Sequence, residues 1–199
     1  MNNTNDQLQP IALKEWAVAV KALTEGDLML VLRKGGIAEE TRDFRLKAPR
    51  FYLMPAYEHQ RPELLKAPYQ DAVRQIMDKW KPGAETVEIG AIAEAVDDIE
   101  IYDRETLDKL QDFHIWTETF AEERLKWKRT KPLHLLLLRV SKLKKPLTLP
   151  MLDQYNGCKS WVSLPDDLDA PGAEPVLSDE EFNQKIDQIR GALGQPSKS

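Results

Sequence analysis

The chain has 199 residues and a formal net charge of −5, with 42% hydrophobic and 31% charged residues. This length predicts a single domain, because one hydrophobic core serves chains of up to roughly 250 residues. A single cysteine, Cys158, excludes an intrachain disulfide and any zinc cluster built from cysteines. The first ten residues lack the basic and apolar regions of a secretory signal. No apolar run, residues 135–138 included, exceeds five residues, far fewer than the roughly 20 of a membrane helix, so we expect a cytoplasmic protein without membrane contact.

Positive charge is concentrated in one segment of this acidic chain. Of the 28 basic residues nine lie in residues 124–145, which contain no Asp or Glu, and this leaves 19 basic against 33 acidic residues elsewhere. Such asymmetry indicates a site for a polyanion, with a nucleotide or nucleic acid as the partner. A solvated loop with basic strand ends is the alternative.

The N-terminal part of the chain allows two interpretations after a polar arm of ten residues. Apolar residues alternate over residues 16–22 and again over residues 28–33, and Gly26 lies in a turn sequence between them, which predicts a β-hairpin. Apolar residues also recur at helical spacing over residues 11–23, so a helix there is the alternative. We favour the hairpin because of the Gly-Asp turn and the valines.

The middle of the chain predicts a strand, a helix and a bent strand. RFYLMPAYEHQ, residues 50–60, has strand character up to a polar cluster. Apolar residues over 69–80 are spaced at i, i+4, i+7, i+8 and i+11, which predicts an amphipathic helix. Residues 86–103 have strand character on both sides of a bend near Gly90 or Ala95.

The C-terminal part predicts two capped helices and a buried strand. Thr117 is the expected N-cap of the first helix. PLHLLLLRVSKL, residues 132–143, is apolar on both faces and therefore predicts a strand in the middle of the sheet. Ser178 and Glu181 form the capping box of the last helix.

Together these elements predict an α+β fold. We expect one domain whose mixed sheet contains an N-terminal hairpin and a central apolar strand and is flanked by helices. A flexible arm over residues 1–10 precedes this domain, which we place at residues 11–164. An acidic loop over residues 165–177, an amphipathic helix over 178–194 and a tail over 195–199 follow.

Short motifs of established mechanism are absent from the sequence. G-x-S-x-G, the P-loop and G-x-G-x-x-G do not occur. None of the histidines, His59, His114 and His134, has a second ligand at metal spacing, so we expect no metal site and name no cofactor. Cys158 has a neighbouring lysine, but no base for nucleophilic work is evident, and we expect a structural cysteine.

The first candidate site follows the third strand in PAYEHQ, residues 55–60. Strand ends of this kind hold polar groups rigidly at an open loop. Tyr57 and Gln60 are candidates for ligand binding. Glu58 and His59 are catalytic candidates, because a carboxylate can orient an imidazole for proton transfer. A hydrogen-bonded turn is the alternative.

The second candidate site lies in DFHIWTETFAEERLKWKRTK, residues 112–131. Phe120, Arg124 and Trp127 share one face of the predicted helix, with Glu123 beside them as a catalytic candidate. An aromatic platform beside positive charge suits a base and its phosphate. The ligand-binding candidates are His114, Trp116, Thr117, Arg124, Trp127, Lys128 and Arg129. In the alternative interpretation the tryptophans are core residues and Glu123 only pairs with its helix neighbours.

Six blocks of the chain occur in a recognisable order: ALKEWAVAVKAL, LVLRKGGI, PAYEHQ, HIWTETFAEERLKWK, LLLLRV and GCKSWV. In this order they resemble a bacterial family known as domain of unknown function 1802, over about Ala12 to Leu164. A threonine is more usual in that family at the position of Ala56. The resemblance implies one cytoplasmic domain with appended tails, and it implies no activity, cofactor or catalytic residue.

The sequence therefore leads to three hypotheses. The preferred one is a nucleotide- or nucleic-acid-binding protein whose site joins the end of the third strand to residues 114–128. The second is a metal-dependent phosphodiesterase or nucleotide hydrolase, in which case alone we expect Mg²⁺. The third is a protein-interaction module that binds its partner through the C-terminal helix or the acidic loop. Whether the protein is an enzyme stays open.

Overall fold

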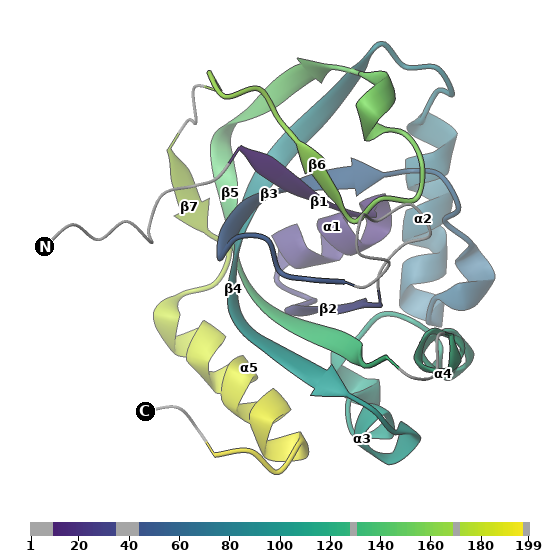
Figure 1. The fold of residues 1–199 in the computed structure, drawn as a ribbon, viewed down its shortest axis with the longest axis vertical. Coiled ribbons are helices and arrows are strands. Elements are labelled where there is room, and N and C mark those ends of the chain that lie inside the picture. The colour runs from purple at the N-terminus through teal and green to yellow at the C-terminus, as the bar shows by residue number, and fades with distance from the viewer. Residues whose placement is uncertain (1–9, 35–43, 128–130, 169–171, 197–199) are drawn as a thin grey trace, which may run out of the picture.

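The computed structural model describes residues 10–34, 44–127, 131–168 and 172–196. Seven strands form one mixed sheet in the order β2-β5-β4-β3-β1-β6, with β7 paired to β5 (Figure 1). The strands are β1 (Ile11–Trp16), β2 (Leu30–Arg33), β3 (Arg50–Ala56), β4 (Thr86–Ile101), β5 (Leu133–Pro150), β6 (Trp161–Ser163) and β7 (Ala173–Pro175).

Helices surround this sheet. The α-helices are α1 (Ala17–Glu25), α2 (Ala67–Lys79), α3 (Arg104–Asp108), α4 (Glu118–Lys126) and α5 (Asp179–Ala192), and the short 3₁₀ helices are η1 (Pro62–Leu64), η2 (Gln111–Phe113) and η3 (Asp153–Tyr155). The predicted α+β class, with a mixed sheet flanked by helices, is confirmed. In the described part of the chain no helix has the length and hydropathy needed to cross a bilayer.

The predicted N-terminal hairpin does not form. The first strand ends at Trp16, and α1 occupies the residues that were expected to continue it. Gly26 is the C-cap of α1 in a left-handed conformation, and its N–H bonds to the last turn of the helix. β1 and β2 pair with other strands, β1 with β3 in parallel and β2 with β5. The glycine that suggested a hairpin turn therefore ends a helix.

The long strand β5 confirms the expectation of an interior apolar strand. It lies between β2 and β4, and residues 135–138 are all buried. β4 pairs with it along nearly its whole length, with irregularities of register between Ile89 and Ala91 and between Ala95 and Asp97. These two irregularities lie at the predicted bend of β4.

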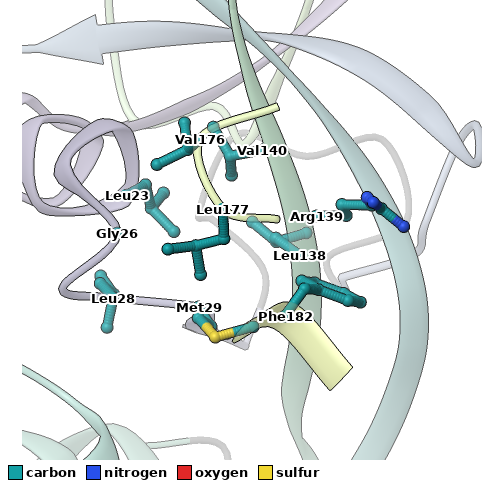
Figure 2. A pocket seen from close by; sticks show the side chains of 10 residues that line it. All are labelled: Leu23, Gly26, Leu28, Met29, Leu138, Arg139, Val140, Val176, Leu177 and Phe182. Atoms are coloured by element: carbon teal, nitrogen blue, oxygen red, sulfur yellow. The ribbon is translucent and has the colours of Figure 1, made fainter. Parts of the chain in front are cut away.

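The C-terminal helix α5 packs on the same core as the sheet, beside the lower parts of β4 and β5 in Figure 1. The predicted capping box between Ser178 and Glu181 is present. Figure 2 shows Leu177 and Phe182 in a small crevice with Leu23, and Phe182 is buried. Arg190 fixes the end of the helix through an ion pair with Asp97 on β4, at 2.9 Å. The apolar stripe of α5 is thus part of the protein's own core.

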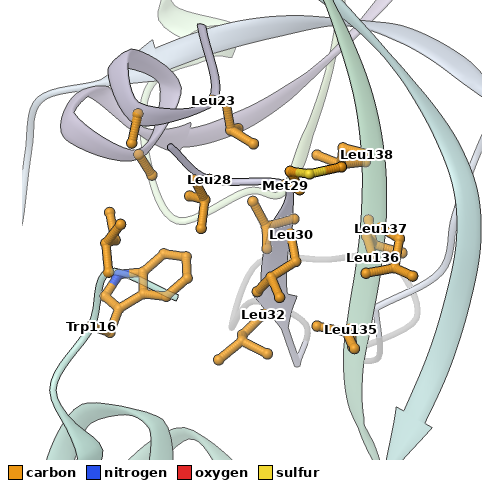
Figure 3. Close-up of a cluster of buried hydrophobic side chains, with 14 of the residues drawn as sticks. Leu23, Leu28, Met29, Leu30, Leu32, Trp116, Leu135, Leu136, Leu137 and Leu138 are labelled. Carbon is orange, nitrogen blue, oxygen red and sulfur yellow. The ribbon is translucent and has the colours of Figure 1, made fainter. Parts of the chain in front are cut away.

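The main hydrophobic core lies around β2, β5 and the helices. In Figure 3 the indole of Trp116 lies among leucines of this core, near Leu28 and Leu32. A second, smaller cluster includes Tyr52, Met54 and Tyr155. Alternate residues of β3 point to the two clusters, because Leu53 belongs to the main core and its neighbours to the smaller one.

Candidate functional site

A cavity of about 430 Å³ opens where the ends of β1, β2 and β3 meet α4. We call it the basic cavity. β1 and β3 are parallel neighbours, with Trp16 opposite Ala56, so their carboxyl ends lie at the same edge of the sheet. The lining residues are Lys14, Glu15, Trp16, Arg33, Ala56, Glu58, His59, Phe120, Glu123, Arg124, Trp127, Gly157, Cys158, Lys159 and Ser160.

A buried ion pair forms part of the wall of the basic cavity. Arg33 Nη1 lies 3.1 Å from Glu15 Oε2, and the two residues are only 9% and 4% exposed. Arg33 Nη2 also donates to the hydroxyl of Ser160, at 2.5 Å. β2 lies at one edge of the sheet, and β1 lies next to the strand at the opposite edge. The ion pair between them shows that the sheet curls until its two edges approach each other.

Arg124 is the second guanidinium at this wall. It lies over the ring of Phe120, 4.9 Å from the centroid, and Nη1 donates to the carbonyl of Leu32 at 3.4 Å. The pKa of Arg124 is lowered to about 10, mainly by burial and next by the positive charge of Arg33, while Glu15 acts in the opposite direction. At neutral pH Arg124 is still protonated, so the wall of the cavity carries two guanidiniums but only one buried carboxylate, Glu15, which pairs with Arg33.

Lys14 holds the loop before β6 against β1. Its Nζ donates to the carbonyls of Tyr155, at 2.5 Å, and Gly157, at 2.9 Å. Burial lowers the pKa of Lys14, and the nearby carboxylate of Glu58 opposes that shift. The ammonium group is therefore fixed by backbone oxygens at the boundary of the cavity.

A second cavity of about 760 Å³ adjoins the basic cavity, and we call it the larger cavity. Lys14, Ala56 and Glu58 line both. One wall carries Tyr57 and Trp80, whose rings stack with centroids 5.8 Å apart and planes 4° apart. The two cavities therefore adjoin at these three residues, along the ends of β1 and β3.

Comparison with protein families identifies the chain. The model of the Domain of unknown function (DUF1802) matches residues 12–188. The chain belongs to this family. No curated protein matches it.

Two solved structures are similar to this member of the DUF1802 family. One is ASCH from Zymomonas mobilis, with 16% identity and a TM-score of 0.43 over 88% of this chain and 92% of the other. The other is a point mutant of the Zymomonas mobilis protein, with 14% identity and a TM-score of 0.45 over 92% and 95%. These values are too low to support an inference about this chain.

Five of the predicted site residues of this DUF1802 protein line the basic cavity. Glu58 and His59 reach it from the end of β3, and Glu123, Arg124 and Trp127 reach it from α4. His59 has a positive φ of 63°, which is uncommon for a residue other than glycine. The structure thus brings the two predicted segments together, and the roles of these residues remain predictions. The candidates Lys128 and Arg129 lie outside the described residues.

Other predicted site residues lie elsewhere. Tyr57 lines the larger cavity. Gln60 is buried and accepts the N–H of Val18 at 2.9 Å, which satisfies a donor in the first turn of α1. Thr117 caps α4 by accepting the N–H of Phe120, at 3.3 Å.

His114 and Trp116 are core residues rather than cavity residues. His114 is 4% exposed and Trp116 is 2% exposed. Neither ring nitrogen of His114 has a hydrogen-bond partner within the described residues. The pKa of His114 is lowered to about 4, mainly by burial and next by the nearby charge of Lys66. The alternative interpretation, that a tryptophan of this segment belongs to the core, is therefore correct for Trp116.

Sequence reasoning did not select several residues of the basic cavity, among them Lys14, Glu15, Arg33 and Lys159. The available signal was charge inside apolar strands, as in LKEW and LVLRK, because a buried charge needs a partner. Cys158 was expected to be structural, yet it is exposed and lies at this cavity. The described residues contain no group of three or more His, Cys, Asp or Glu side chains arranged to hold a metal.

Proposed function

We propose that this member of the DUF1802 family binds a nucleotide or single-stranded nucleic acid in the basic cavity. Phosphate lies near Arg124 and Lys159, and a base stacks on the aromatic wall. The observation that carries this proposal is the lining of the cavity, where two guanidiniums, Arg33 and Arg124, lie with one buried carboxylate, Glu15, and three aromatic side chains.

The charges of the cavity favour an anion. Its lining contains four basic residues, Lys14, Arg33, Arg124 and Lys159, against three acidic ones, Glu15, Glu58 and Glu123. Glu15 is already paired with Arg33, and Glu58 and Glu123 are exposed to solvent. The partly desolvated guanidinium of Arg124 therefore gains from a phosphate more than an exposed arginine does.

Trp127 offers the most exposed aromatic surface for a base, because Phe120 is buried and has Arg124 over its ring. Trp16 and Phe120 pack with ring centroids 5.3 Å apart. Trp127, at the end of α4, exposes 41% of its surface. Bases stack on such side chains without a strong sequence preference, which suits binding to single strands or to free nucleotides.

A hydrolase is the second candidate, because groups able to transfer protons line the same cavity. Glu58, His59 and Glu123 are all exposed there. If the protein hydrolyses a bound nucleotide, Glu123→Gln should abolish turnover while it leaves binding and folding intact. Unchanged turnover in that variant would remove Glu123 from the chemistry. The protein-interaction alternative is less favoured, since the apolar side chains of α5 are buried in the core.

Titration of the intrinsic tryptophan fluorescence tests the proposed binding, because Trp16 and Trp127 line the cavity. Nucleotides and short single-stranded oligonucleotides should bind at low salt and weaken as salt rises. We expect Arg124→Met to lower the affinity about 10- to 100-fold, the range of a hydrogen bond to a charged group.

The matched control is Arg74→Met. Arg74 is exposed on α2, pairs with Asp71 at 2.6 Å and is not among the residues that line the cavity. This variant should bind like the parent protein. Absence of binding by the parent at low salt, or equal losses in the two variants, would refute the proposal.

A further inference from the structure

The larger cavity has the size and the lining of a small-molecule binding site. Its volume of about 760 Å³ falls in the range of roughly 300–1,000 Å³ that is typical of ligand sites. Apolar and aromatic side chains make up much of its wall, including Met54, Tyr57, Ile76, Trp80 and Val87. An uncharged ring system fits this apolar part of the wall, and the exposed Lys79 and Lys81 line the cavity as well.

The larger cavity also contains polar groups that can orient the ring of a ligand. Thr148 and Asn156 line it, together with Glu88. Tyr155 lines it as well, is 1% exposed, and has a hydroxyl without a hydrogen-bond partner among the described residues. A buried hydroxyl without a partner is costly unless something else satisfies it.

The junction between the two cavities carries a positive charge. Lys14 lines both, and its Nζ is held in place by the carbonyls of Tyr155 and Gly157. A ligand that extends from one cavity into the other passes this ammonium group. An anionic link between two rings is therefore favoured at this point.

We propose that the two cavities form one site for two consecutive nucleotides. The first base stacks on the aromatic wall of the basic cavity, the linking phosphate passes Lys14, and the second base enters the larger cavity beside Tyr57 and Trp80. This inference rests on the proposed function and adds to it the length of the ligand. The shared chemistry is two bases joined by a phosphodiester, either as a free dinucleotide or as part of a single strand.

The test compares ligand lengths in the full chain. The probes are the dinucleotides ApA, CpC, GpG and UpU, their mononucleotides, and six-residue single strands of each base. The best dinucleotide should bind about 5- to 150-fold more tightly than its mononucleotide, the range of one added stacking interaction. A six-residue strand that binds no better than the dinucleotide identifies the free dinucleotide as sufficient, whereas a further gain identifies a strand as the ligand.

Two variants locate the second base. Trp80→Leu should remove most of the advantage of the dinucleotide and leave the affinity for the mononucleotide unchanged. Tyr155→Phe should weaken the dinucleotide alone without loss of thermal stability, because it deletes a hydroxyl that has no partner in the described part of the chain. This second variant keeps the test decisive if Trp80→Leu does not fold.

Three results would overturn the inference. Equal affinities for mononucleotide and dinucleotide, with no effect of either variant, would leave only a one-nucleotide site. Equal weakening of both ligands by Trp80→Leu and Tyr155→Phe would place the base of a single nucleotide in the larger cavity. Absence of binding by every probe would refute the proposed function itself, a result distinct from the other two.

Discussion

Protonation of His114 should make the protein sensitive to mild acid. This side chain is buried beside Trp116, with ring centroids 6.0 Å apart, and Lys66 Nζ bonds to its carbonyl at 2.6 Å. Burial, and next the charge of Lys66, lower the pKa of His114 from 6.5 to about 4. An imidazolium in this position would be desolvated beside another cation, so the folded protein resists protonation.

The sign and size of the effect follow from this difference in pKa. The unfolded chain binds a proton at this histidine below about pH 6.5, and the folded protein only below about pH 4. Stability is therefore lost as the pH falls from about 6.5 to about 4, and the loss is then complete. The free energy of unfolding falls by about 3 kcal/mol in total, and about 2 kcal/mol of this loss has occurred at pH 5. For a chain of this size 2 kcal/mol lowers the Tm by about 4 to 8 °C.

Urea denaturation of the parent protein and of His114→Phe, at pH 7 and at pH 5, measures this contribution. The free energy of unfolding of the parent should fall by about 2 kcal/mol more than that of the variant. His114→Gln serves the same purpose if the phenylalanine does not fit. The control is His59→Asn, because His59 is exposed and asparagine tolerates its positive φ. A variant without His114 that loses as much stability as the parent would refute the reasoning.

Two further predictions concern stability. Gly26→Ala should cost about 2 kcal/mol or more by thermal denaturation, because its Cβ would lie 2.8 Å from Leu177 Cδ2 at a φ of 79°. Gly83→Ala has a similar φ of 77° with no described atom within 4 Å, so it should cost only about 1 kcal/mol, and equal losses would exclude the contact with Leu177. Glu15→Gln should destabilise the protein by about 3 to 5 kcal/mol in urea, because Arg33 would remain buried without its carboxylate, and a loss below about 1 kcal/mol would show that the pair is dispensable.

Elements with strong local signals could be predicted from the sequence. The amphipathic pattern of α2, the cap at Thr117 and the capping box at Ser178 depend on residues a few positions apart, and all three are confirmed. The prediction of an N-terminal hairpin was wrong because the local signals around Gly26 conflicted. Gly26 is equally suited to a hairpin turn and to the end of a helix, and burial of Val18 and Leu23 against the sheet decided for the helix.

The candidate site was predictable in part for the same reason. The spacing of Arg124 and Trp127 on one helix, and the polar end of β3, are local features, and both line the basic cavity. The pairing of Glu15 with Arg33 depends on the curl of the whole sheet, which no spacing in the sequence encodes. The contact of Lys14 with the carbonyl of Tyr155 joins residues 141 positions apart. Such contacts need the three-dimensional structure.

The pairing of β1 with β6 also determines when, during synthesis, this edge of the sheet can first be completed. It joins Ile11 to Ser163, and Lys14 N–H bonds to the carbonyl of Ser160 at 2.8 Å. A ribosome adds roughly 5 to 20 residues per second, so β1 waits roughly 8 to 30 s for the strand that completes this edge. During that interval an unpaired edge of β1 is open to other chains. Nascent chains that stop before Gly157 lack part of the wall of the basic cavity, so the site that we propose cannot form until this late segment has been made.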